Sequence, residues 1–138
     1  MPEKALSGFE EIEHTADWAL RVWAPDLAGL LEEAARGMFA LSGIRLEVGA
    51  REMRSLKVES TDAEGLLVNF LSELLHLAEK EKLAFDTFEL LVSESVVDAR
   101  LEGAPIVEQK KEIKAVTYHN LSVRAGPQGM SAEVVFDV

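Results

Sequence analysis

The sequence has no cysteine among its 138 residues. Disulfides, thiolate metal sites and thiol nucleophiles are therefore excluded, and with them any cluster for a soft metal. The lack of disulfides is typical of proteins that work in the reducing cytoplasm, so the sequence predicts a cytoplasmic protein.

Long apolar runs are also missing. No stretch approaches the roughly 18 uninterrupted apolar residues that span a bilayer. The opening residues, MPEKALSGFEE, have neither the basic start nor the apolar run of a signal peptide. We therefore expect a soluble protein with no membrane association.

Basic residues are scarce: 14 lysines and arginines stand against 25 acidic residues, for a formal charge of −11. A field of that sign repels phosphate backbones, so no direct, stable binding of nucleic acid is expected. It favours metal cations or a basic protein partner, although much of the charge also serves solubility. The Walker loop, GxSxG, HExxH and Rossmann motifs are absent as well, so nucleotide binding and the common hydrolase chemistries have no motif behind them.

The composition that remains is that of a globular protein. Hydrophobic residues make up 48% of the chain, and there are only 4 prolines and 9 glycines. This length suits one compact domain, so we predict a single domain over residues 1–138.

Apolar spacing predicts the elements. Alternation over residues 9–24 predicts one strand that ends at Pro25, and Asp26 is placed to cap a helix that Gly43 closes. A strand over 52–59 precedes a second helix, which Thr61 and Glu64 would open as a capping box. The predicted buried faces of the two helices are Leu27, Leu30, Leu31, Ala34, Ala35, Met38 and Phe39, and Leu66, Leu67, Phe70, Leu71, Leu74, Leu75 and Ala78.

Strand spacing dominates the second half of the chain. A hairpin is predicted over 88–101 with its turn at 93–95, followed by a loop over 103–112. Strands are predicted over 113–117, 121–125 and 131–138, with the GPQG turn at 126–129. The fold class is therefore α+β, with two helices packed on one face of a largely antiparallel β-sheet.

Three short segments carry candidate chemistry. The first contains His14 and Asp17, whose odd spacing sends their side chains to opposite faces of an ideal strand. On spacing alone, a hydrogen-bonded structural histidine is favoured over a catalytic base. Asp17 lies between apolar neighbours and would need a metal ion, a lysine or backbone amides as its partner.

The second and third segments lie near the end of the chain. Lys114 to His119, KAVTYH, offers an amine and a titratable imidazole, although by residue type alone a surface lysine and a histidine at a strand end are the favoured reading. Asp137 and the carboxylate or carbonyl of Val138 could converge with Asp17 if the last strand lies beside the first. That all-oxygen set would suit calcium, magnesium or manganese; an exposed strand end that binds nothing is the simpler reading.

These segments, in this order, resemble the archease family. Phe9-Glu10 through HTAD at 14–17 is similar to its opening signature, KAVTYH to its most distinctive internal motif, and Asp137-Val138 to its usual ending. The similarity also runs through the predicted helix from Asp26 and through LSELLHLAEKEKLAF at 71–85, so it covers essentially the whole chain.

The resemblance implies a metal-binding accessory protein of the RtcB-type RNA ligase of tRNA splicing and RNA repair. Such a protein is not itself an enzyme: it promotes GTP-dependent guanylylation of the ligase and its multiple turnover. The resemblance assigns a divalent cation, calcium before magnesium or manganese, to Asp17, Asp137 and Val138. It adds Lys114 to a functional cluster, for which His14 and His119 are further candidates.

The sequence departs from the family pattern at two places, and two other functions are alternatives to the one that the resemblance implies. Ala19 stands where the family commonly has glycine, and the loop over 103–112 is shorter than usual. The same cluster, with His14 or His119 as base, could serve a metal-dependent hydrolase. A metal-stabilised, chaperone-like binding module without a ligase is the other alternative.

Overall fold

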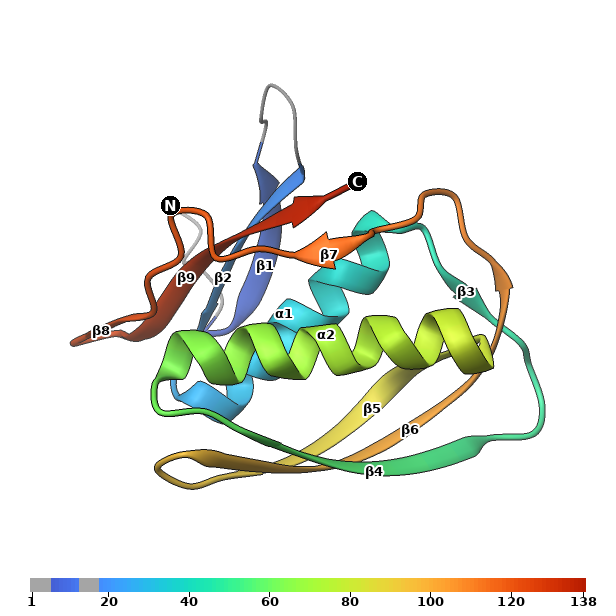
Figure 1. The fold of residues 1–138 in the computed structure, drawn as a ribbon, viewed down its shortest axis with the longest axis horizontal. Helices are drawn as coiled ribbons and strands as arrows, with labels where there is room; N and C mark the ends of the chain where they lie inside the picture. The colour runs from blue at the N-terminus through green and yellow to red at the C-terminus, as the bar shows by residue number, and fades with distance from the viewer. Residues whose placement is uncertain (1–5, 13–17) are drawn as a thin grey trace.

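The computed structural model describes residues 6–12 and 18–138, which form two helices and several antiparallel strands (Figure 1). The α+β class and both helices are thus confirmed. The elements are β1 (Gly8–Ile12), β2 (Trp18–Ala24), α1 (Leu27–Leu41), β3 (Arg45–Leu46), β4 (Glu52–Glu59), α2 (Ala63–Glu81), β5 (Leu83–Val92), β6 (Val96–Glu108), β7 (Ala115–Val116), β8 (Arg124–Gly126) and β9 (Gly129–Asp137).

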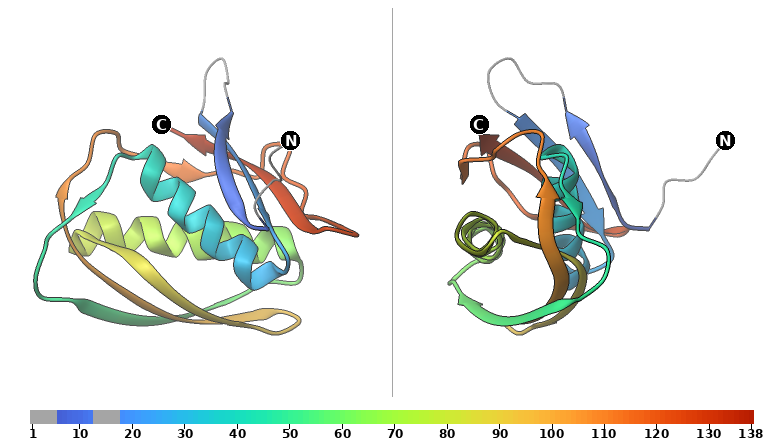
Figure 2. Two further views of the ribbon diagram at one scale, coloured as in Figure 1. Left: turned by 180° about the vertical axis from the view of Figure 1, so that it is seen from behind. Right: turned by 90° about the vertical axis from the view of Figure 1, so that its right-hand side faces the viewer.

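The strands form two sheets, where the sequence predicted one. The first has the order β1-β2-β9-β7, with β8 also paired to β9. The second has the order β3-β6-β4, with β5 paired to β6. Both helices lie between the sheets, α1 against β2 and β5 and α2 against β4 and β7 (Figures 1 and 2). Alternation along a strand shows that one face is buried, but it does not show which strands share a sheet, and this explains the error.

The single strand predicted over 9–24 is wrong. Strands β1 and β2 run antiparallel, with partners from Gly8 and Trp23 to Ile12 and Ala19. Even-numbered apolar residues continue on both sides of the reversal, so the pattern resembled one uninterrupted strand. Residues 13–17, with the predicted His14 and Asp17, lie outside the described residues.

Helix α1 forms as its sequence predicts. Asp26 is the N-cap, and its Oδ1 accepts a hydrogen bond of 2.8 Å from the Gly29 amide. The predicted apolar face is almost entirely buried, and the chain leaves the helix through Gly43 at φ 64°. Gly37 lets β2 approach closely, since a Cβ there would lie 2.4 Å from Leu20 Cδ2.

Helix α2 has the predicted buried face but a different cap. The N-cap is Asp62, not Thr61, and its Oδ1 accepts a hydrogen bond of 2.7 Å from the Gly65 amide. Glu64 therefore does not close a capping box. Its Oε2 instead accepts a hydrogen bond of 2.7 Å from the amide of Val123, far along the chain. Asp62 competes with Thr61 for the same role, which the sequence alone did not resolve.

The loop predicted over 103–112 is mostly strand. Strand β6 continues to Glu108 because both its edges find partners there: Leu83 lies opposite Pro105, and Arg45 lies opposite Glu108. Its glycine and proline are typical of a loop and led to that prediction. In this sheet, however, Gly103 lets the backbone of β5 at Ala84 and Phe85 approach closely. In contrast, the strands predicted over 113–117 and 121–125 shorten to β7 and β8.

An ion pair on the second sheet gives a pH prediction. Hydrogen bonds from Arg51 hold the pKa of the Asp86 carboxyl below its usual value. A lowered folded pKa contributes stability above the unfolded pKa of about 3.9, and this contribution is lost as pH falls through the folded value. We expect the small stability difference between the wild type and Arg51→Gln, measured by urea unfolding, to be present at neutral pH and to diminish as the pH falls through the pKa of Asp86. A difference that does not change with pH across the acidic range would contradict this assignment.

Neither helix in the described part of the chain has the length and apolar character needed to cross a membrane.

Candidate functional site

The end of β9 brings distant parts of the chain together at one edge of the first sheet. Phe136 lies opposite Trp18, where β2 begins, and on its other side opposite Val116 of β7. Asp137 lies opposite Ala115, and its carbonyl accepts a hydrogen bond of 2.8 Å from the Lys114 amide. The last strand therefore lies beside β2, as convergence with Asp17 would require, and it also lies beside the KAVTYH segment.

The side chains at the end of β9 alternate as a half-buried strand requires. Phe136 is fully buried and anchors the strand, whereas Asp137 is exposed and Val138 is half-buried. No described cationic side chain forms an ion pair with Asp137. An exposed carboxylate beside main-chain carbonyls offers charged and neutral oxygen atoms, which are the ligands that a hard cation prefers.

The described residues alone do not form a metal centre. Within residues 6–12 and 18–138, no three histidine, aspartate or glutamate side chains lie together as metal ligands. Of the predicted ligands, Asp137 and Val138 lie at the end of β9, and Asp17 lies outside the described residues. A cation at this edge would require a further ligand, and Asp17 is joined by one peptide bond to Trp18, the partner of Phe136. Asp137 and Val138 therefore supply oxygen atoms of the kind that a hard cation takes, and the described residues do not complete a site.

The predicted motif residues Lys114 and His119 lie on either side of β7. Both are exposed, Lys114 before the strand and His119 in the turn after it. The His119 amide donates a hydrogen bond of 3.2 Å to Thr117 Oγ1, and its Nε2 lies 3.3 Å from Asn120 Nδ2. Lys114 is thus next to Asp137 along the sheet edge, and His119 is held a few residues further on.

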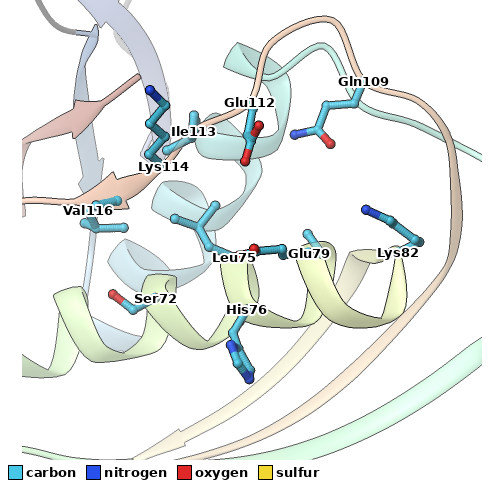
Figure 3. A pocket seen from close by; sticks show the side chains of 12 residues that line it. Ser72, Leu75, His76, Glu79, Lys82, Gln109, Glu112, Ile113, Lys114 and Val116 are labelled. Atoms are coloured by element: carbon cyan, nitrogen blue, oxygen red, sulfur yellow. The ribbon is translucent and has the colours of Figure 1, made fainter.

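A pocket of about 790 Å³ lies behind this edge, between α2 and residues 109–116 (Figure 3). Leu75, Ile113 and Val116 supply apolar lining, while Glu79 and Lys82 come from α2 and its C-cap. Figure 3 shows the Glu112 carboxylate directed toward α2 and the Lys114 amine directed away from it. The pocket is therefore next to the predicted cluster, but the Lys114 amine does not point into it.

Another side chain ties this region to the site's edge. The Lys111 amine lies 6.0 Å from the ring centroid of Trp18, within the range of a cation–π contact. The contact links residues 109–112 to the start of β2. It gives the segment after β6 a contact with this edge that the sequence did not suggest.

The family model for the Archease protein family (MTH1598/TM1083) matches residues 9–138. The chain belongs to the archease family. Among archease relatives, the protein from Pyrococcus abyssi is 32% identical over 142 residues, covering 96% of this chain and 100% of the relative. The protein from Methanopyrus kandleri is 34% identical over 138 residues, covering 94% of this chain and 99% of the relative.

Two solved archease-like structures share the fold. The solution structure of Methanobacterium thermoautotrophicum protein 1598 has a TM-score of 0.71 and 25% identity, covering 95% of this chain and 99% of that one. The crystal structure of an archease from Thermotoga maritima, described as a possible chaperone, has the same TM-score and identity, covering 94% of this chain and 96% of that one. The chain therefore has the same overall fold as these two proteins.

Sequence reasoning missed two residues that shape this archease site. Thr117 Oγ1 donates a hydrogen bond of 2.9 Å to the Val135 carbonyl, and Glu64 holds the chain after β7. Thr117 could have been singled out from the sequence, because it is the threonine of the KAVTYH motif. Glu64 carried none, because its partner is a main-chain amide 59 residues away.

Proposed function

We propose that this protein is a metal-binding accessory protein that activates an RtcB-type RNA ligase by promoting GTP-dependent guanylylation of the ligase and its repeated turnover. The observation that supports the proposal is the convergence at the end of β9. Asp137 lies beside the start of β2 and beside Lys114 in a chain of the archease family. These are the segments to which the resemblance assigns the metal ligands and the functional lysine.

The proposed cation site uses Asp137, a main-chain or carboxylate oxygen of Val138, and Asp17. All of these donors are oxygen atoms, so calcium is expected first, with magnesium or manganese as alternatives. When bound, such a cation offsets negative charge that develops in guanylyl transfer. The protein's own residues position the site: Phe136 fixes β9 in the core, and the Asp137 carbonyl fixes the backbone of Lys114.

Lys114 is proposed to act on the ligase's nucleotide. Its side chain is exposed, and its amine points away from the α2 pocket (Figure 3). An ammonium group beside an acidic edge could contact a phosphate of GTP held by the ligase and steady it during transfer. The long-range field of a chain with net charge −11 favours approach to a basic protein, as an RNA-binding ligase must be along its RNA path.

The test is guanylylation of a cognate ligase with labelled GTP and a manganese salt. We expect wild-type protein to stimulate labelling and Asp17→Ala to lose that stimulation. Asp98→Ala makes the same change of charge on exposed β6 of the other sheet and should stimulate as the wild type does. An active cognate ligase that the wild type fails to stimulate would overturn the proposal.

A chaperone-like binding module is the second candidate, because the Thermotoga maritima protein is described as a possible chaperone. It predicts metal-dependent melting without any effect on ligase guanylylation. A metal-dependent hydrolase with His14 or His119 as base predicts turnover of a phosphoester panel by the isolated protein. Either result, together with no stimulation of the ligase, would favour the corresponding alternative over the accessory function.

A further inference from the structure

The chain between β7 and β8 carries an exposed aromatic residue on a fixed backbone. We call Thr117–Val123 the contact loop. Tyr118 is 59% exposed, while Leu121 and Val123, further along the loop, are partly buried against the core. In Figure 1 the contact loop (orange-red) descends from β7 on the side of the molecule where α2 begins. Tyr118, His119 and Asn120 thus form an exposed tip between partly buried residues.

Hydrogen bonds fix the tip from within. Thr117 Oγ1 donates to the Val135 carbonyl of β9 and accepts from the His119 amide at 3.2 Å. The Leu121 amide donates to the Tyr118 carbonyl at 3.0 Å, and Asn120 adopts φ 53° to close the turn. Asparagine tolerates this left-handed backbone better than most residues.

Glu64 fixes the far end of the contact loop. It lies in the first turn of α2, half-buried, and accepts the Val123 amide at 2.7 Å. The N-terminus of a helix stabilises a carboxylate, and a charge-assisted bond to a main-chain amide is stronger than a neutral one. The bond links α2 to the loop that follows the KAVTYH motif.

Several restraints act on the backbone around this surface tyrosine. Single exposed apolar residues are common and need no explanation. Here, however, a side-chain hydroxyl, a left-handed asparagine and a distant carboxylate all restrain the few residues that carry Tyr118. Tyrosine supplies a large contact area with only two side-chain torsions, and a backbone ordered in advance loses little entropy on binding. The tip therefore has the properties of a recognition element.

We propose that the contact loop is a binding element for a protein pocket on the ligase, with Tyr118 as its anchor and Glu64 as the positioning residue. The inference rests on the proposed function for the identity of the partner. A protein is favoured over RNA because the net charge of −11 opposes a phosphate backbone. The tip itself carries no carboxylate, so it can enter an apolar or mixed pocket without burying a negative charge.

The first test measures affinity for the cognate ligase by biolayer interferometry. We expect Tyr118→Ala to weaken binding at least about tenfold, as removal of a buried anchor does. The control Leu91→Ala removes a residue that is 69% exposed on β5 of the other sheet, and it should bind as the wild type does. The melting-temperature shift caused by added calcium should be unchanged in both variants, which separates loss of contact from loss of the cation site.

The second test compares two substitutions of Glu64. Glutamine keeps an acceptor oxygen for the Val123 amide, whereas alanine removes it. We expect Glu64→Ala to speed hydrogen exchange of that amide and to weaken ligase binding several-fold, and Glu64→Gln to restore most of both. Wild-type affinity in Glu64→Ala despite fast exchange would remove Glu64 from the positioning role.

The outcomes separate the two proposals. If the wild type neither binds nor stimulates an active cognate ligase, the proposed function fails and this inference fails with it. If the wild type binds and stimulates, but Tyr118→Ala binds equally well, the proposed function stands and the contact loop is not the binding element. Direct binding of a single-stranded RNA by the isolated wild-type protein that is lost in Tyr118→Ala would favour RNA as the occupant and overturn the inference.

Discussion

Replacing Asp137 by alanine is expected to remove the rise in melting temperature that calcium, magnesium or manganese gives the wild-type protein. Asp137 is the one predicted ligand with a side-chain carboxylate in the described part of the chain, and it has no cationic side chain as a partner there. A cation that binds only the folded state stabilises it by about 2.7 kcal/mol at 100 times Kd. Loss of a carboxylate ligand should weaken affinity by roughly 100-fold, because the affinity of such sites follows ligand charge.

Differential scanning fluorimetry across a cation titration measures this effect. Asp98→Ala is the matched control, because it removes one exposed carboxylate from the second sheet and should keep the full shift. A glycine added after Val138 moves a terminal carboxylate away and leaves the Val138 carbonyl in place, so it distinguishes these two ligands. An undiminished cation shift in Asp137→Ala would remove the end of β9 from the metal site.

Gly103→Ala should destabilise the fold by about 3 kcal/mol or more, at the upper end of what overpacking costs. Gly103 lies in the middle of β6, opposite Glu52 of β4 on one side and Phe85 of β5 on the other. A Cβ at this position would lie 1.9 Å from the Ala84 carbonyl oxygen and 2.7 Å from the Phe85 Cα. Both obstacles are backbone, so a flexible side chain cannot move aside and the strands would have to separate.

Urea unfolding followed by circular dichroism gives the change in the free energy of unfolding. The control is Gly126→Ala in β8, where no atom lies within 4 Å of the added Cβ and the backbone does not need glycine. It should change stability by less than about 0.5 kcal/mol, as exposed substitutions usually do. Equal stability of the two variants would show that β5 and β6 can separate at little cost.

The sequence predicted what depends on local pattern. Helix α1 and its Asp26 cap, the buried face of α2 and the β5–β6 hairpin all follow from short-range spacing and from the helix's need for an N-cap acceptor. The predictions were wrong where the structure depends on which strands pair with one another. The division into two sheets, the reversal between β1 and β2, and the extension of β6 past Gly103 depend on pairing between residues distant in sequence.

The candidate site likewise combines features that local pattern predicts with features that depend on residues distant in sequence. The alternation that buries Phe136 and exposes Asp137 can be read from a strand pattern, and the family motifs selected the segments that meet. The bond from Val123 to Glu64 could not be read, because any of many carboxylates could accept a main-chain amide. Neither could the Lys111 contact with Trp18, which depends on how residues 109–112 cross the sheet edge.

The central position of β9 has a consequence for how the chain is made. Strand β2, which pairs with β9, is synthesised early. Phe136, the partner of Trp18, follows over 100 residues later. The second sheet, from β3 to β6, can pair as soon as its own continuous stretch has left the ribosome. Until β9 arrives, the apolar edge of β2 is open to other chains, so a stalled or truncated product should aggregate through that edge. The last strand therefore both completes the candidate site and covers the edge of β2 that is exposed during biosynthesis.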